Sequence, residues 1–69
     1  MTYEQAIKDF SDAIRMTEDC ADAYYGRGVA HRAAGQSEDA IKDFRQAARL
    51  NPEKYGDRVT ATLRTYLRA

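Results

Sequence analysis

Hydrophobic residues recur every three or four positions along most of the chain, which is the spacing of one face of an amphipathic helix. The first such stripe consists of Tyr3, Ala6, Ile7, Phe10, Ala13 and Ile14. The second consists of Ala40, Ile41, Phe44, Ala47 and Leu50, and the last of Tyr55, Val59, Leu63, Tyr66 and Leu67. No stretch alternates polar and apolar residues with the period of two that marks a strand. The pattern therefore predicts an all-α fold.

Capping and turn residues divide this pattern into separate helices. Thr2 and Gln5 have the spacing of a capping box at the start of the first stripe, and Ser37 is a suitable N-cap for the second. Gly35 suits the left-handed position that ends a helix, and Pro52 the first position of a new one. The sequence thus predicts four helices, over about residues 3–17, 21–34, 37–50 and 53–68.

Two segments of the chain repeat each other. Residues 3–18 read YEQAIKDFSDAIRMTE, and residues 37–52 read SEDAIKDFRQAARLNP. When Ala6 is aligned with Ala40, 34 residues later, eight of the sixteen positions are identical. Such agreement over an ungapped segment is not expected by chance, so the chain is built from a repeated unit.

A 34-residue unit of two helices that ends in proline resembles the tetratricopeptide repeat. Residues 21–54 resemble one complete repeat, residues 3–18 the second helix of a preceding repeat, and residues 55–69 the helix that caps such an array. The positions that carry the resemblance are Ala6, Phe10, Ala13, Tyr24, Gly28, Gly35, Ala40, Phe44, Ala47 and Pro52. The resemblance implies a single domain of antiparallel helix pairs, stacked as a short right-handed solenoid.

Two residues near the middle of the chain make specific demands on the packing. Gly28 costs about 1 kcal/mol in a helix relative to alanine, so we expect a bulky side chain to pack over it. Arg27, where the family usually has leucine, falls on a face between the two copies, where an unpaired charge is costly. We expect a structural ion pair with Asp43, or with Asp9 at the equivalent position. The alternative is an Arg27 side chain that extends to water.

Composition excludes several classes of function. Lys and Arg number 11 and Asp and Glu also 11, a balance that argues against binding nucleic acid by neutralising phosphates. The single Cys20 and the single His31 form neither a disulfide framework nor a zinc site, and no base–nucleophile pair is visible. No apolar run approaches the roughly 20 residues of a membrane span, and no export signal is visible. We therefore expect a cytoplasmic protein without catalytic activity, cofactor or metal.

The resemblance implies that the first helix of each unit lines a concave surface that holds a peptide or a partner helix. By position, this groove would be lined by Tyr25, Val29, Arg32, Val59, Leu63 and Tyr66. The alternative is that the last three of these residues only seal the end of the array. The leading hypothesis for function is accordingly a non-catalytic scaffold for protein–protein interaction.

The first helix suggests a second hypothesis, because no helix precedes it. We expect an uncovered edge formed by Tyr3, Ile7, Phe10 and Ile14. Such an edge would self-associate, exchange a helix with a second copy, or continue a longer array, and the chain would then be a minimal, fragmentary or engineered repeat module. A third hypothesis, an RNA-binding helical repeat, rests on the basic residues Arg58, Arg64 and Arg68.

Overall fold

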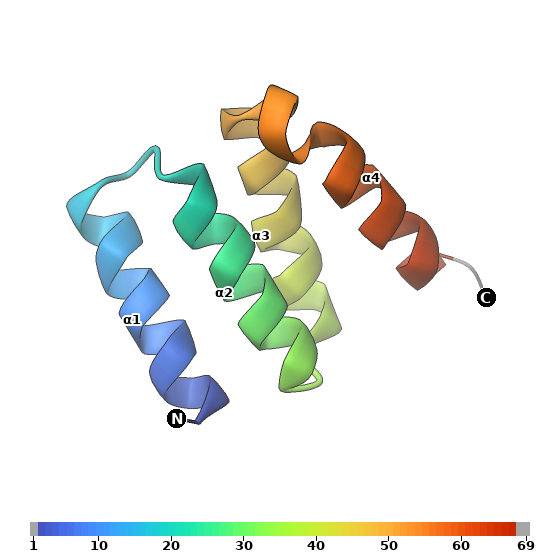
Figure 1. Cartoon of the computed structure of the whole chain (residues 1–69). Coiled ribbons are helices and arrows are strands. Elements are labelled where there is room, and N and C mark those ends of the chain that lie inside the picture. Colours follow the sequence, from blue (N-terminus) through green and yellow to red (C-terminus); the bar gives the residue numbers. More distant parts are fainter. Residues whose placement is uncertain (1, 68–69) are drawn as a thin grey trace.

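Four helices make up most of the computed structural model, which describes residues 2–67 (Figure 1). They are α1 (Tyr3–Met16), α2 (Ala21–Ala33), α3 (Ser37–Leu50) and α4 (Pro52–Leu67). No strand is present among the described residues. The predicted all-α class and the four predicted helices are confirmed, and each helix end lies within one residue of its predicted position.

Local sequence sets the ends of these helices. The Thr2 side chain accepts a hydrogen bond from the Gln5 backbone N–H at 3.1 Å, and the Gln5 side chain accepts one from the Thr2 N–H at 3.3 Å, which completes the predicted capping box. Gly35 adopts a φ of 80°, the left-handed conformation expected of it. Its N–H and that of Gln36 donate to the last carbonyls of α2.

This tight turn explains one difference from the prediction. Ser37 was expected to cap α3, but Gln36 occupies the N-cap position and Ser37 is the first helical residue. The Gln36 N–H donates to the carbonyl of His31 at 2.8 Å, so the same residue both closes α2 and starts α3. No residue is left between the two helices to serve as a separate cap.

Helix α2 is the central element of the fold. It packs between α1 and α3, while α4 packs on α3 at the other end of the molecule (Figure 1). The buried hydrophobic cluster lies among α2, α3 and α4 and consists of Ala21, Ala40, Phe44, Ala47, Tyr55 and Val59. In contrast, α1 contributes no fully buried residue. The hydrophobic core is therefore formed by the last three helices.

The two equivalent phenylalanines of the repeat each pack against a glycine of α2. A Cβ atom at Gly28 would lie 2.7 Å from the ring of Phe44, which is 0% exposed. This confirms the expectation of a bulky side chain over Gly28. A Cβ atom at Gly26 would lie 2.5 Å from the ring of Phe10 in the same way. The sequence alone gave no reason for Gly26, and the structure supplies one.

Phe10, which the sequence placed on an uncovered edge of α1, packs against Gly26 of α2 and is half-buried. Ile7 and Ile14 lie three residues before and four residues after Phe10, on the same side of α1, and both are half-buried. Of the four residues of that edge, Tyr3 is largely open, with 56% of its surface exposed. The helical spacing identified the residues that share a face, but not the neighbour that covers it.

The contact between Gly28 and Phe44 leads to a stability prediction. Gly28→Ala places a methyl group against a fully buried ring, and we expect a loss of about 1–3 kcal/mol from overpacking, which exceeds the gain in helix propensity. Gly56→Ala in α4 is the matched control, because its Cβ atom would approach no atom more closely than 4.0 Å. That change should stabilise the protein by roughly 0.5–1 kcal/mol. Urea unfolding measures both, and equal stabilisation by the two substitutions would contradict the packing described above.

Candidate partner-binding surface

An aromatic row connects three helices. The ring of Tyr25 in α2 stacks on that of Tyr55 in α4, with a centroid distance of 4.7 Å and an interplanar angle of 17°. The same Tyr25 ring lies 5.3 Å from that of Phe44 in α3, at an angle of 49°. Both distances fall in the range in which aromatic pairs attract one another. Tyr25 is therefore half-buried by this row and offers a partner only the remaining part of its ring.

Asp22 attaches the first turn of α2 to the first turn of α4. Its Oδ1 atom accepts a hydrogen bond from Lys54 Nζ at 2.9 Å and another from the Tyr55 hydroxyl. These two bonds, the one from Tyr55 first, hold the pKa of Asp22 below its usual range. The same contact raises the pKa of Lys54, while burial and the hydrogen bond to Asp22 raise that of Tyr55. The cluster fixes the start of α4 against α2.

Two exposed arginines lie over rings of the aromatic row. The guanidinium carbon of Arg58 is 5.8 Å from the centre of the Tyr25 ring, and that of Arg32 is 5.8 Å from the centre of the Phe44 ring. Neither arginine forms an ion pair with any residue in the part of the chain that the structure describes. Val29, one helical turn before Arg32, is 36% exposed. An apolar side chain and two available guanidinium groups thus occur on one side of the molecule.

The structure separates the six residues that were expected to line a groove. Val59 is only 2% exposed and belongs to the core, so it is not available to a partner. Leu63 and Tyr66 are half-buried and pack against the same core, as does Tyr25. Val29 and Arg32 remain on the surface. The sequence left two roles open for Val59, lining a groove or sealing the end of the array. Its burial agrees with the second role.

Tyr66 carries an unusual polar group. Its hydroxyl is buried, and none of residues 2–67 forms a hydrogen bond with it. A buried hydroxyl without a partner costs about 1–3 kcal/mol. Tyr66 is also the residue of this group that lies closest to the end of α4.

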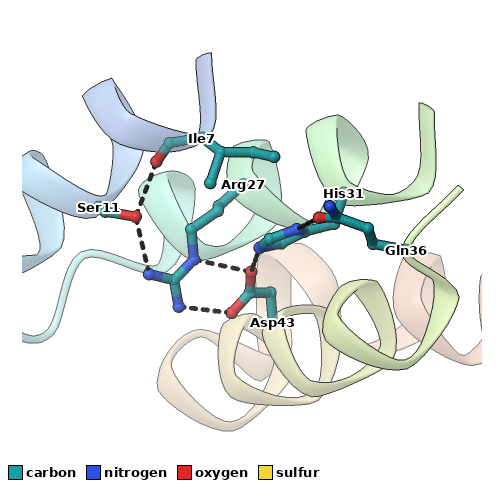
Figure 2. A network of polar contacts seen from close by, with 6 residues as sticks. All are labelled: Ile7, Ser11, Arg27, His31, Gln36 and Asp43. Carbon is teal, nitrogen blue, oxygen red and sulfur yellow. Dashed lines mark hydrogen bonds and ion pairs between the residues drawn. The ribbon is translucent and has the colours of Figure 1, made fainter. Parts of the chain in front are cut away.

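A polar network of six residues links α1, α2 and α3 (Figure 2). Arg27 Nε donates to Asp43 Oδ2 at 2.8 Å and Nη2 donates to Oδ1 at 2.7 Å, so the pair is bidentate, and Asp43 is only 5% exposed. Donating these hydrogen bonds to Asp43 raises the pKa of Arg27. Arg27 Nη1 also donates to Ser11 Oγ at 3.2 Å, and Ser11 in turn donates to the carbonyl of Ile7 at 2.7 Å.

The partner of Arg27 on α3 is thus Asp43, while its contact on α1 is Ser11 and not Asp9. Sequence reasoning missed Ser11, since its counterpart in the second copy is Arg45 and the alignment gave no sign of a shared role. The network also includes His31, whose Nε2 lies 3.5 Å from Asp43 Oδ2 and whose Nδ1 lies 2.5 Å from Gln36 Oε1. His31 therefore belongs to the packing between helices, in contact with a carboxylate and an amide.

The remaining surface shows two shallow hollows. One is lined by Thr2, Tyr3, Glu4, Ala33, Ala34 and Gln36, and the other by Gln5, Lys8, Asp9 and Asp12. Neither includes the residues expected to line the groove. Within residues 2–67, no three His, Cys, Asp or Glu side chains are placed to hold a metal ion. Over the same residues, no helix has the length and apolar character needed to cross a membrane.

Of the basic residues that suggested RNA binding, the structure describes Arg58 and Arg64. Arg58 lies over the ring of Tyr25, and Arg64 is in the last turn of α4, where a positive charge is favourable for the helix. Arg68 lies outside the described residues. The two that are described each have a role in the packing or stability of their helix.

The bidentate pair predicts strong coupling between Arg27 and Asp43. Removing one partner leaves the other charge buried, which costs about 3–5 kcal/mol, a large part of the stability of so small a domain. Arg27→Met and Asp43→Leu should each unfold much of the population, whereas the double variant should recover helicity and stability. Circular dichroism with urea unfolding measures this, and additive losses in the double variant would show that the pair is not coupled.

The contacts of Asp22 predict a pH dependence. Because these contacts lower the pKa of Asp22 in the folded state, they stabilise the fold above the ordinary pKa of an aspartate, and this stabilisation is lost as the pH falls through the lowered value. Asp22→Asn should therefore lower the melting temperature at pH 7 and make little difference near pH 2. Asp57→Asn, an exposed residue of α4 without an ion pair in the described part of the chain, is the control. A deficit of Asp22→Asn that is independent of pH would contradict this account.

Comparison with known proteins gives one match. A sequence model of the tetratricopeptide repeat family matches residues 2–55, which is 54 of the 69 residues and includes α1, α2 and α3. The comparisons with curated proteins and with solved structures found no match. Repeats of this family generally mediate protein–protein interaction and are typically non-catalytic. The 34-residue register, the glycine–phenylalanine contacts and this match agree, and the chain belongs to the tetratricopeptide repeat family.

Proposed function

We propose that the chain is a non-catalytic scaffold that binds a peptide or a partner helix on the side where α2 and α4 meet. This surface, the α2–α4 face, consists of Tyr25, Val29, Arg32, Arg58, Leu63 and Tyr66. The observation that carries the proposal is that Val29 and Arg32 are both exposed and lie one helical turn apart, beside the aromatic row. The general role of the family supports the same conclusion.

The chemistry of this face suits an extended peptide or a short helix. Val29 offers apolar contact, and the guanidinium of Arg32 can pair with a carboxylate or a backbone carbonyl. Because Arg32 and Arg58 lie against aromatic rings, they lose less conformational entropy when a ligand binds than freely moving side chains would. Arginine and tyrosine are also the residue types that most often dominate binding energy.

A selected peptide tests the role of Arg32. Peptides selected from a random library on the chain should bind the parent protein, and Arg32→Ala should weaken that binding by about tenfold, the loss expected when one charge-assisted contact is removed. Arg45 is also an exposed arginine, but it lies on α3 and outside the α2–α4 face. Arg45→Ala is therefore the matched control and should leave binding unchanged. Fluorescence anisotropy measures affinity, and circular dichroism should show an unchanged fold for both variants. Equal effects of the two substitutions, or no enriched peptide, would count against the α2–α4 face.

A further inference from the structure

A shallow hollow lies where the start of α1 meets the end of α2, and it shares no residue with the α2–α4 face (Figure 1). Its volume is about 460 Å³. The six residues that line it are all exposed, and they are Thr2, Tyr3, Glu4, Ala33, Ala34 and Gln36. The packing of the helices therefore leaves this hollow open to a ligand from solution.

Two adjacent residues of α1 give the hollow a carboxylate and an aromatic ring. Glu4 forms no ion pair with any of residues 2–67. Beside it, Tyr3 is 56% exposed. The face of a tyrosine ring attracts cations, as does a carboxylate without a partner. Both side chains thus favour a positively charged ligand.

The end of α2 adds partial negative charge to the same hollow. A helix leaves its last carbonyl groups without partners inside the helix, and they carry the negative end of its dipole. Here the tight turn around Gly35 pairs the three carbonyls that precede that of Ala33. The carbonyls of Ala33 and Ala34 accept no backbone hydrogen bond from residues 2–67. Two carbonyl groups at this helix end are therefore available as acceptors.

The basic residues in the last turn of α2 do not neutralise this end of the helix. His31 contacts Asp43 of α3 through Nε2 and Gln36 through Nδ1 (Figure 2). The guanidinium of Arg32 lies over the Phe44 ring. Neither basic residue lines the hollow. A cation near these carbonyls, which is favourable at a helix C-terminus, must therefore come from elsewhere.

We propose that this hollow binds the side chain of an arginine presented by a partner protein. Its guanidinium stacks on the Tyr3 ring and donates hydrogen bonds to the Glu4 carboxylate and to a carbonyl at the end of α2. A guanidinium is planar, so it can lie on an aromatic ring while its N–H groups remain free to donate. The inference goes beyond the proposed function, because the α2–α4 face offers arginines to a ligand whereas this hollow receives one.

Other occupants fit the hollow less well. The ammonium of a lysine is a compact charge that does not stack on a ring in the manner of a guanidinium. A carboxylate or phosphate would be repelled by Glu4, and the Gln5 N–H in the first turn of α1 is already capped by Thr2. An apolar side chain would cover the Glu4 carboxylate without pairing it, which is costly. Arginine satisfies the ring, the carboxylate and the carbonyl together.

The direct test titrates the isotope-labelled chain with arginine that is acetylated at its amino group and amidated at its carboxyl group. We expect saturable NMR shifts at the amides of Tyr3, Glu4, Ala33 and Ala34, with a dissociation constant in the millimolar range, as suits so small a ligand. The same derivative of citrulline has the shape of arginine without its charge and should give no saturable shifts. The lysine derivative should bind several-fold more weakly. Equal binding of lysine and arginine would contradict the proposed stacking.

Variants of the chain test the two side chains of α1. Glu4→Gln should raise the dissociation constant of the arginine derivative by about tenfold, since a charge-assisted hydrogen bond is lost. Tyr3→Leu should raise it about threefold, because the cation–π contact is lost. Glu53→Gln removes an exposed acid from the first turn of α4 and is the matched control, which should leave binding unchanged. Circular dichroism should show an unchanged fold for all three variants.

The pattern of shifts separates a site from general attraction between charges. Shifts that are spread over the exposed acids of all four helices would overturn the proposal. Equal effects of Glu4→Gln and Glu53→Gln would overturn it as well, because only Glu4 lines the hollow.

Discussion

The close approach of α2 to two phenylalanine rings is the constraint on which the rest of the structure depends. Gly26 admits Phe10 from one side and Gly28 admits Phe44 from the other, so α2 lies close to both of its neighbours. Arg27 stands between these glycines in the sequence. Because both neighbouring helices are close, its guanidinium reaches Ser11 on α1 and Asp43 on α3 at the same time. Packing thus places the polar network, and the network in turn fixes the relative position of three helices.

The attachment of α4 follows from different interactions. The aromatic row and the Asp22 cluster place its first turns against α2, and Val59 continues the contact into the core. This placement makes part of the predicted groove a packing surface and leaves Val29 and Arg32 accessible. The candidate binding surface is therefore a consequence of how α4 packs, with the arginines held over rings that belong to the core.

Local signals in the sequence were sufficient to predict the four helices, because caps, proline and the helical period act within a few residues of one another. The partner of Arg27 was also predictable, since a charge buried between two copies of a unit requires an acid at one of a few positions. The contact of Ser11 with Arg27 and that of Asp22 with Tyr55 were not predictable. They join residues 16 and 33 positions apart and depend on how each helix is rotated about its axis. The same rotation explains why Phe10, expected at a free edge, faces α2.

The attachment of α4 has a consequence for how this helix opens. Helices α1, α2 and α3 share a partly buried ionic network, whereas α4 is attached at its start by an exposed ion pair and at its far end carries a buried hydroxyl without a partner. Regions with fewer buried contacts open at lower free energy than the rest of a structure. Within α4, local opening should therefore begin at its far end and proceed toward its proline. A ligand that spans α2 and α4 would suppress this fraying, so that ligand binding and the folding of the end of α4 would be thermodynamically coupled.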